Sequence, residues 1–310
     1  MSLARKLLLR ASRSEWLANQ FRRRAFARRA VRRFMPGEEL SAALDASAEF
    51  SRQGIGSVLT NLGERVTTRG EGAAVRERYL TALMRIQDLA LPSQISVKLT
   101  HLGLDADREA CTQNVLALAD EAVKTGSFVW IDMEESHYVD ATLEAFRRAR
   151  AAHSNVGVCI QAYLRRTEAD INALLPLEPA IRLVKGAYNE PALIAYTSKK
   201  EVDAQYVFLA ERLLNAAARG GAPAVFGTHD MRLIARIREH ARAIGAGKTA
   251  YEIHMLYGIR ASDQRALAAD GHVVRALISY GTAWFPWYMR RLAEKPSNVW
   301  FVLRNLLGGG

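Results

Sequence analysis

Eight short apolar segments, separated by segments with helical periodicity, are the feature of this 310-residue sequence that most constrains its fold. The apolar segments cover residues 57–61, 95–99, 128–133, 156–162, 181–184, 224–227, 251–255 and 273–278. Between them the periodicity predicts amphipathic helices, for example over residues 108–124, 138–152, 202–218 and 231–244. Strands that are apolar throughout are typical of parallel sheets covered by helices. The pattern therefore predicts an α/β fold, a closed (β/α)₈ barrel of the TIM type.

An open, doubly wound sheet is the alternative arrangement of the same elements. Open sheets that bind dinucleotides carry a G-x-G-x-x-G motif at the start of the first helix, and this sequence has no such motif there. The closed barrel is therefore the more economical prediction. We expect an N-terminal helical arm over residues 1–53, a catalytic barrel over residues 54–310, and a C-terminal helix over the barrel mouth.

The formal net charge of +11 is concentrated in the first 35 residues. Eleven of the 43 Lys and Arg residues lie there, but only one of the 32 Asp and Glu residues, so the remaining chain has 32 bases and 31 acids. A nearly neutral main domain argues against binding of nucleic acid. The basic segment also carries Leu, Phe and Trp, and it lacks the continuous apolar core of a secretory signal. It is predicted to be an amphipathic arm that either binds an anionic membrane surface or an acidic partner, or caps the barrel.

Neither a membrane span nor a metal site is expected. No apolar run approaches the roughly 18 residues that a spanning helix needs. The cysteines, Cys111 and Cys159, have no second Cys or spaced His pair beside them, so we expect two buried, reduced thiols and no metal. These features predict a cytoplasmic protein, either free or peripheral on the inner face of the cytoplasmic membrane.

Polar side chains stand at the ends of nearly all the predicted strands. They are Lys98, Asp132, Gln161, Arg182 with Lys185, Thr228 with His229, Glu252 with His254, and the loop that begins at Tyr280. Barrels of this type build their active sites at the C-terminal ends of the strands. One such residue alone often caps a helix or pairs with a neighbour, but packing does not explain the whole set.

Seven sequence strings that carry these residues resemble the proline dehydrogenase family in order and spacing. They are ISVKLT (95–100), WIDMEE (130–135), IQAYL (160–164), RLVKGAY (182–188), GTHD (227–230), EIHMLYG (252–258) and WYMRRLAE (287–294). The resemblance extends over residues 57–307. It implies flavin-dependent oxidation of L-proline to Δ1-pyrroline-5-carboxylate, with the electrons passed to a membrane quinone.

The resemblance also implies noncovalent FAD as the cofactor, because neither cysteine lies in the matching strings. The implied FAD-binding residues are Met133, Gln161, Arg182, Val184, Lys185, Gly186, Ala187, Thr228 and His229. Arg182 would lie against the flavin ring and act in catalysis together with Asp132, since positive charge and hydrogen-bond donors tune a flavin. Gly186 would allow the backbone to approach the cofactor. The alternative for Arg182 and Lys185 is an inter-strand ion pair.

For the substrate, the resemblance implies binding by Lys98, Leu256, Tyr288, Arg290 and Arg291. Arg290 and Arg291 are adjacent on a predicted helix and diverge by about 100°, so both reach one carboxylate only if that helix crosses the barrel mouth. Guanidinium groups suit this task because they pair bidentately with carboxylates. Glu294, one turn further on, would hold one of them in place. Aromatic residues of the same helix would cover the proline ring, and Asp132 would orient Lys98.

One string departs from the family pattern. Residues 275–281 read RALISYG, with Leu277 where a pocket tyrosine is usual and Ser279 where proline is usual. A related cyclic imino acid, such as hydroxyproline or a larger and more apolar ring, is therefore an alternative substrate. Two other function classes remain: a barrel lyase that forms a Schiff base on Lys98 or Lys185, and a non-catalytic membrane or nucleic-acid adaptor that uses the arm alone.

Overall fold

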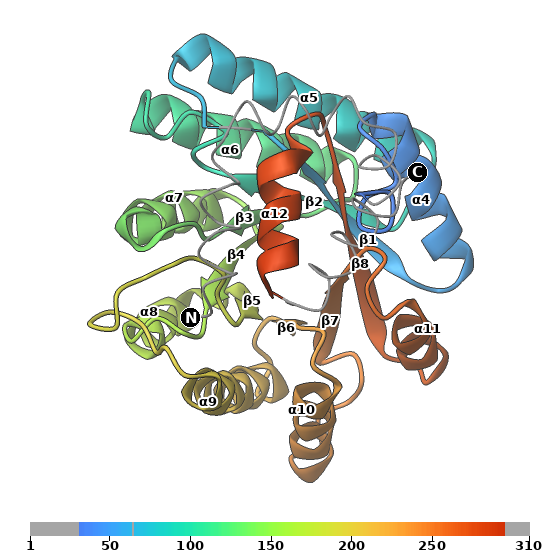
Figure 1. Cartoon of the computed structure of the whole chain (residues 1–310), viewed down its shortest axis with the longest axis vertical. Coiled ribbons are helices and arrows are strands. Elements are labelled where there is room, and N and C mark those ends of the chain that lie inside the picture. Colours follow the sequence, from blue (N-terminus) through green and yellow to red (C-terminus); the bar gives the residue numbers. More distant parts are fainter. Residues whose placement is uncertain (1–30, 64, 295–310) are drawn as a thin grey trace, which may run out of the picture.

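The computed structural model describes residues 31–63 and 65–294, and the side chains of the last helix up to Met289. Eight parallel strands close into one barrel in chain order (Figure 1). They are β1 (Gly56–Asn61), β2 (Ser93–Lys98), β3 (Val129–Asp132), β4 (Val156–Gln161), β5 (Ala180–Val184), β6 (Ala224–Gly227), β7 (Tyr251–Leu256) and β8 (Val273–Tyr280). Each predicted apolar segment overlaps one strand, so the predicted barrel is confirmed.

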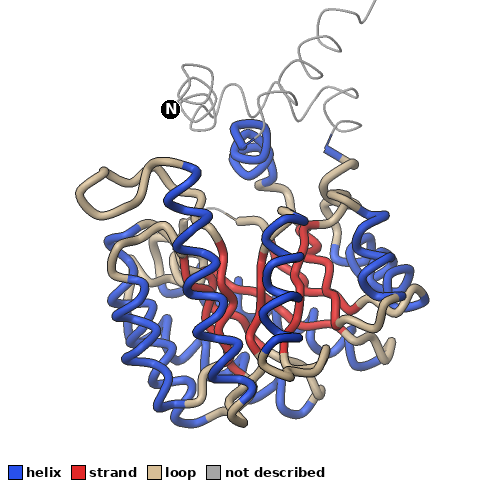
Figure 2. The backbone as a smooth tube through the Cα atoms, turned by 90° about the horizontal axis from the view of Figure 1, so that it is seen from below, coloured by secondary structure: helices blue, strands red, loops and turns tan. Residues whose placement is uncertain are grey.

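Helices form a ring around the strands (Figure 2). The outer helices that follow β1 to β7 are α5 (Arg69–Asp88), α6 (Arg108–Lys124), α7 (Val139–Ala152), α8 (Thr167–Leu174), α9 (Lys199–Ala218), α10 (Met231–Ala243) and α11 (Ala261–Ala269), with short 3₁₀ turns η1 (Ser136–Tyr138) and η2 (Leu175–Leu177). Capping boxes at Thr68 and Ser198 begin α5 and α9, because each side chain accepts a backbone N–H that is otherwise unpaired.

In a (β/α)₈ barrel each strand is usually followed by a helix of the outer ring. Here the helix that precedes the barrel takes the outer place that the helix after β8 would normally occupy. α12 (Trp284–Glu294) crosses the barrel mouth, as predicted, whereas α4 (Leu40–Arg52) packs outside β8 and β1 (Figure 1). Ala43 and Leu44 of α4 belong to the main hydrophobic core. The Phe50 ring meets the Tyr257 ring edge-on, with 5.9 Å between centroids. α4 thus completes the outer layer of the barrel, while the domain boundary after residue 53 stays a prediction.

A second hydrophobic cluster joins α12 to residues 31–35. Its members are Val31, Phe34, Met35, Leu62, Trp284, Phe285, Trp287, Tyr288 and Met289. Gly258 has a positive φ of +71°, and a Cβ there would lie 1.7 Å from the Arg33 carbonyl oxygen. Glycine is therefore required for this segment to approach the end of β7 so closely. The Trp284 indole also donates to Glu38 at 2.7 Å, which fixes the start of α12.

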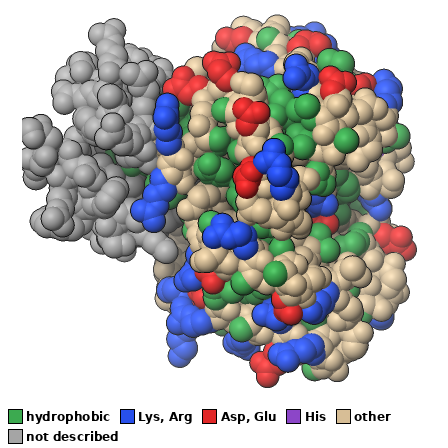
Figure 3. All heavy atoms as spheres, turned by 90° about the vertical axis from the view of Figure 1, so that its right-hand side faces the viewer, with side chains coloured by type: hydrophobic (Ala, Val, Ile, Leu, Met, Phe, Trp, Pro, Cys, Tyr) green, Lys and Arg blue, Asp and Glu red, His purple; other side chains and the backbone are tan. Residues whose placement is uncertain are grey.

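Basic and acidic side chains are interspersed over the described surface that faces the viewer in Figure 3. This distribution agrees with the nearly neutral charge of the chain after its first 35 residues. Within the described ranges, no helix has the combination of length and apolar character needed to cross a bilayer. Cys111 and Cys159 are buried free thiols, as expected.

Candidate active site

Lys98, Asp132 and Arg182 meet at the C-terminal end of the barrel. Lys98 and Asp132 are register partners at the ends of β2 and β3, with 3.3 Å between Nζ and Oδ2. Arg182, in the middle of β5, extends its Nη2 to the other oxygen of the same carboxylate in a short ion pair. Ser96 completes the set: its hydroxyl donates to Asp132 at 3.0 Å and accepts from Arg182 at 2.7 Å. Residues from three strands are thereby held in one network.

The charges of this network stabilise one another. Burial alone would raise the pKa of Asp132, but Lys98 and Arg182 outweigh burial and hold the pKa below its usual value. Burial likewise disfavours the charged form of Arg182, which is only 3% exposed, and Asp132 outweighs it and raises the arginine pKa. Two cations and one anion give these three residues a net positive charge, which favours an anionic ligand. The nearby Glu134, which binds Thr100, has its pKa raised by burial, which opposes a second negative charge here.

One nitrogen of Arg182 has no nitrogen or oxygen partner among the described residues, although the Cys159 thiol, on the register partner of Arg182 in β4, also interacts with the guanidinium. Nη1 is buried and has no hydrogen-bond partner within the described part of the chain. A buried, unpaired donor is costly unless a ligand or water accepts its hydrogen bond. The position therefore suits a molecule that presents an acceptor, such as a ring nitrogen or carbonyl oxygen.

Lys185 belongs to a separate ionic cluster. Its Nζ lies 2.5 Å from Asp203 Oδ1 of α9 and 3.4 Å from Asp230 Oδ2 at the start of α10. Burial acts to raise the pKa of Asp230, but Arg232 and Lys185 lower it to about 2. The alternative of an inter-strand ion pair describes Arg182, which pairs with Asp132, but not Lys185. Sequence analysis missed Asp203 because it lies within a helix, far from the strand ends.

The packing around Gly186 requires glycine at this position. Its φ is +109°, and a Cβ at this position would lie 2.1 Å from the ring of Tyr163. The Tyr163 ring therefore excludes a side chain here, and the expected approach of the backbone to a cofactor stays a prediction. Val184 and Ala187 flank this position and are partly exposed.

Side chains at the ends of β4 and β6 form hydrogen bonds with backbone groups of nearby segments. His229 Nε2 accepts from the amide of Leu256 at 2.9 Å, which ties β6 to the end of β7. Thr228 accepts from the Asp230 amide at 3.2 Å. Gln161 donates to the Glu134 carbonyl at 2.9 Å. The side chain of Met133 is buried in the main core, and its contact with a cofactor stays a prediction.

Glu252 and His254 do not stand at a strand end, so that part of the prediction was wrong. β7 continues to Leu256, which leaves both side chains inside the barrel. His254 donates to Glu252 at 2.9 Å, and Arg275 of β8 donates to the same carboxylate oxygen at 2.7 Å. Burial acts to raise the pKa of Glu252, but His254 and Arg275 lower it to about 2.

α12 carries the remaining predicted residues. Tyr288 is buried, with its ring centroid 6.0 Å from that of Phe34. The aromatic side chains of α12 pack in the second cluster with Phe34 and its neighbours, so their expected contact with a substrate ring stays a prediction. Arg290, Arg291 and Glu294 lie on α12, and their side chains are outside the described part of the structure.

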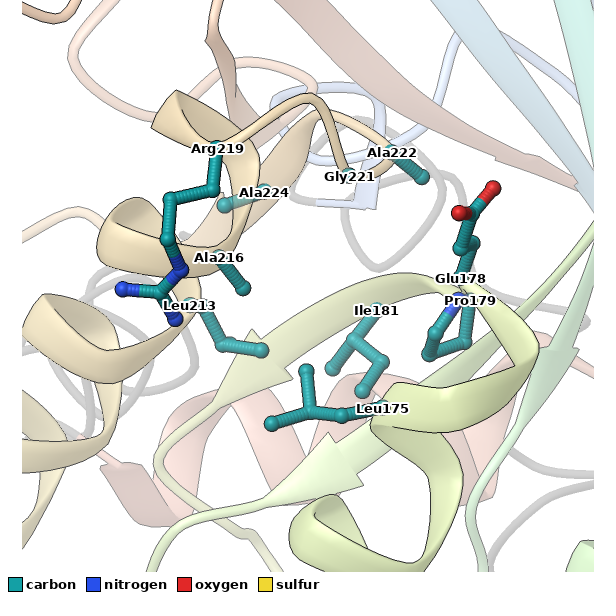
Figure 4. A pocket seen from close by; sticks show the side chains of 10 residues that line it. All are labelled: Leu175, Glu178, Pro179, Ile181, Leu213, Ala216, Arg219, Gly221, Ala222 and Ala224. Atoms are coloured by element: carbon teal, nitrogen blue, oxygen red, sulfur yellow. The ribbon is translucent and has the colours of Figure 1, made fainter.

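A pocket of about 190 Å³ lies at the opposite end of the barrel (Figure 4). It is lined mainly by small and apolar side chains where β5 and β6 begin, and by two charged ones, Glu178 and Arg219. The described residues also contain no group of three or more His, Cys, Asp or Glu placed to hold a metal ion. We assign the chemistry to the other end, where parallel barrels carry their active sites.

An ionic network at the C-terminal mouth of a closed parallel barrel defines this protein as a barrel enzyme. Comparison with known proteins then identifies its family. The proline dehydrogenase family model matches residues 43–304. Proline dehydrogenase 1 of Bacillus subtilis is 34% identical over 277 residues, which are 89% of this chain and 90% of that protein. Proline dehydrogenase of Deinococcus radiodurans is 35% identical over 282 residues, with the same coverage of both chains.

The chain belongs to the proline dehydrogenase family of oxidoreductases. Solved structures agree on the fold. Proline utilization A of Bdellovibrio bacteriovorus, inactivated by N-propargylglycine, superposes with a TM-score of 0.79 at 23% identity over 86% of this chain. The chain spans about a third, 32%, of that longer protein.

Two buried histidines give a prediction for stability against pH. Burial, aided by Lys98 and Arg78, lowers the pKa of His101 to about 4. Burial lowers the pKa of His254 to about 4 despite the opposing effect of Glu252. The unfolded chain, with histidine pKa values near 6.5, then binds more protons between pH 6.5 and 4. The free energy of unfolding should therefore fall as the pH decreases through this window, by on the order of 3 kcal/mol per histidine.

Urea unfolding from pH 7 to 4 measures this effect. His101→Gln and His254→Gln should each flatten the slope, and His137→Gln, at an exposed position, serves as the matched control. Unchanged slopes in both buried variants would contradict the assignment.

Proposed function

We propose that this enzyme oxidises L-proline to Δ1-pyrroline-5-carboxylate with noncovalent FAD and transfers the electrons to a membrane quinone. The observation that carries the proposal is the Lys98–Asp132–Arg182 network, with its net positive charge and the unpaired Nη1 of Arg182. Its place in a proline dehydrogenase barrel supports proline as the substrate.

The residues at the mouth fit a flavin. A flavin ring presents nitrogen and carbonyl acceptors and gains negative charge on reduction, so it is stabilised by donors and positive charge. Arg182 offers both. The remainder of FAD would be held by Gln161, Val184, Lys185, Gly186, Ala187, Thr228, His229 and Met133. Noncovalent attachment is supported because both cysteines are buried and the Nε2 of His229 is engaged by a backbone amide. Bound FAD would supply the acceptor for the hydride from the carbon next to the ring nitrogen of proline.

The chain's own residues would position the substrate. Arg290 and Arg291 hold the carboxylate from α12, and Lys98 completes the clamp from the strand below. Glu294 orients one of the arginines. Asp132 keeps Lys98 in place toward the substrate carboxylate and Arg182 in place toward the flavin. This arrangement places the reacting carbon in one orientation, which lowers the entropic part of the barrier.

Leu256 and Leu277 support an unsubstituted ring. They are register partners on β7 and β8 and form an apolar wall beside the strand ends. A ring hydroxyl against this wall would lose its hydrogen bonds to water without gaining a partner. Hydroxyproline is therefore the poorer substrate, although a larger apolar ring remains compatible with the wall.

The first test is the flavin itself. The protein should purify with FAD that acid precipitation releases completely, and L-proline should bleach its visible absorbance without oxygen. Hydroxyproline should bleach it roughly tenfold more slowly because of the desolvated hydroxyl. Anaerobic stopped-flow absorbance measures both rates. A colourless protein that does not take up FAD, or a flavin that proline does not reduce, would refute the proposal.

The carboxylate clamp gives a second prediction. Arg290→Ala and Arg291→Ala should raise KM for proline about 30-fold or more, since breaking a charge-assisted pair costs about 2 to 5 kcal/mol. Inhibition by cyclic carboxylates that lack the amine should be lost, while FAD content stays unchanged. Arg238→Ala, which removes a partly exposed arginine paired with Asp270, is the control. Normal inhibitor binding by either clamp variant would place the carboxylate elsewhere.

The basic arm supports a membrane-bound electron acceptor. A quinone is dissolved in the bilayer, so a reaction with it requires the enzyme to dwell at the membrane surface. Basic residues near an anionic surface contribute about 1 kcal/mol each, and the interleaved apolar side chains allow shallow insertion. Val31, Phe34 and Met35 belong to the second cluster with residues of α12, so a deletion that tests the arm ends at residue 30 and keeps these three residues.

Deletion of residues 1–30 should reduce cosedimentation with anionic vesicles at least about tenfold and slow turnover with a bilayer quinone. Turnover with a soluble dye should stay within about twofold. Deletion of residues 1–35 is the comparison, because it also removes Val31, Phe34 and Met35 and should lower the unfolding temperature. If the shorter deletion already unfolds the protein or releases FAD, the arm is a structural cap.

The two other function classes fit less well. A Schiff-base lysine relies on desolvation in an apolar pocket, whereas Lys98 and Lys185 both contact carboxylates. An adaptor that uses the arm alone gives no reason for the ionic network inside the barrel. Borohydride trapping in the presence of substrate would reveal a lyase.

A further inference from the structure

Trp130 lies in the middle of the barrel, where it contacts Arg182 from below. The Arg182 Cζ is 4.9 Å from the centroid of the Trp130 ring. The tryptophan is 2% exposed, and β3 turns it inward together with Asp132, two residues further on. The arginine that pairs with Asp132 therefore also lies over an aromatic ring.

The position of the indole is fixed on two sides. Its Nε1 donates to Gln94 Oε1 of β2 at 2.7 Å. On the other side, Gly157 is the register partner of Trp130 on β4, and a Cβ there would lie 2.6 Å from Cζ3 of the indole. The strand beside the tryptophan thus carries the one residue type that leaves room for it.

A third contact comes from His254 of β7. The His254 ring meets the Trp130 ring edge-on, with 5.7 Å between centroids and an interplanar angle of 81°. His254 is held by Glu252, and Glu252 by Arg275, which also donates to the Pro92 carbonyl at 3.0 Å. Gln94, Gly157 and this chain of contacts fix the ring in one orientation.

We propose that Trp130 is a positioning residue that holds the Arg182 guanidinium in the orientation in which its Nη1 faces the flavin. The inference rests on the proposed function, because it assigns a role to Arg182 toward that cofactor. Three groups restrain Arg182: the Asp132 carboxylate and the Ser96 hydroxyl both bind its Nη2, and the indole supports the face of the guanidinium. Bonds to one nitrogen leave the plane free to tilt, whereas a cation–π contact in a desolvated site fixes the plane as well.

The predicted effect is on electron transfer to the flavin rather than on substrate affinity. Trp130→Leu should lower the rate of flavin reduction by proline about tenfold, with KM nearly unchanged, because the carboxylate is held by α12. The reduced flavin should also be less stabilised. A tenfold smaller equilibrium constant for its reduction corresponds to a midpoint potential about 30 mV lower for a two-electron couple.

The experiment compares three variants as FAD-loaded full-length enzymes. Trp130→Phe keeps an aromatic face and should restore rate and potential to within about threefold of the wild type. Phe128→Leu is the matched control: this residue directly precedes β3, its ring centroid lies 5.0 Å from that of Trp130, and within the described part of the chain it makes no cation–π contact with Arg182. If Trp130→Leu fails to fold, a ring-fluorinated tryptophan at position 130 keeps the shape but weakens the π face, and should lower the potential with each added fluorine.

The readouts are anaerobic stopped-flow reduction, the midpoint potential and the FAD content. If the wild type binds FAD and is reduced by proline while Trp130→Leu and the fluorinated variants keep its potential and rate, the inference is overturned and the proposed function stands. If Phe128→Leu lowers the potential as much as Trp130→Leu, the effect is general loosening of the barrel and the inference is also overturned. A wild type that proline does not reduce refutes the proposed function instead.

Discussion

The packing of Trp130 in the barrel centre is the contact on which the rest of the interior depends. Above it lie Asp132 and Arg182, and below it lie Glu252 and Arg275. A charge in such a poorly solvated place is costly unless it is paired, and each of these arginines has its own carboxylate. The indole contacts both groups of charges: Arg182 lies over its face, and His254, the partner of Glu252, meets it edge-on.

Two glycines make this interior possible. Gly157 leaves room for the indole, and a Cβ at Gly56 would lie 2.6 Å from Nη1 of Arg275. Neither glycine has a positive φ, so the backbone conformation does not require glycine there. Glycine is needed because a larger side chain would not fit beside the strand. Large interior side chains on one strand therefore fix which residue its neighbour can carry.

The sequence predicted the strands well because all of them are buried on both faces, which produces continuous apolar runs. The sequence also drew attention to Lys98, Asp132 and Arg182, since polar residues in such runs are conspicuous. The structure brings these three together, while their roles toward substrate and cofactor stay predictions. It did not predict how deep Glu252 and His254 lie, because an apolar run has no period that tells inward from outward positions. Contacts such as that of Asp203 with Lys185 were missed because they join segments through the fold and leave no local pattern.

The crossing of α12 over the mouth follows from how the chain leaves β8. Gly281 has a φ of +112°, its amide donates to the Glu38 carbonyl at 2.8 Å, and a Cβ there would lie 2.6 Å from the Leu62 carbonyl oxygen. The chain is thereby turned inward at a position that only glycine accommodates. α4 fills the outer place that an eighth helix would otherwise take beside β8 and β1. Because the outer layer is already complete, the last helix is left to carry Arg290 and Arg291 across the end of the barrel where Arg182 lies.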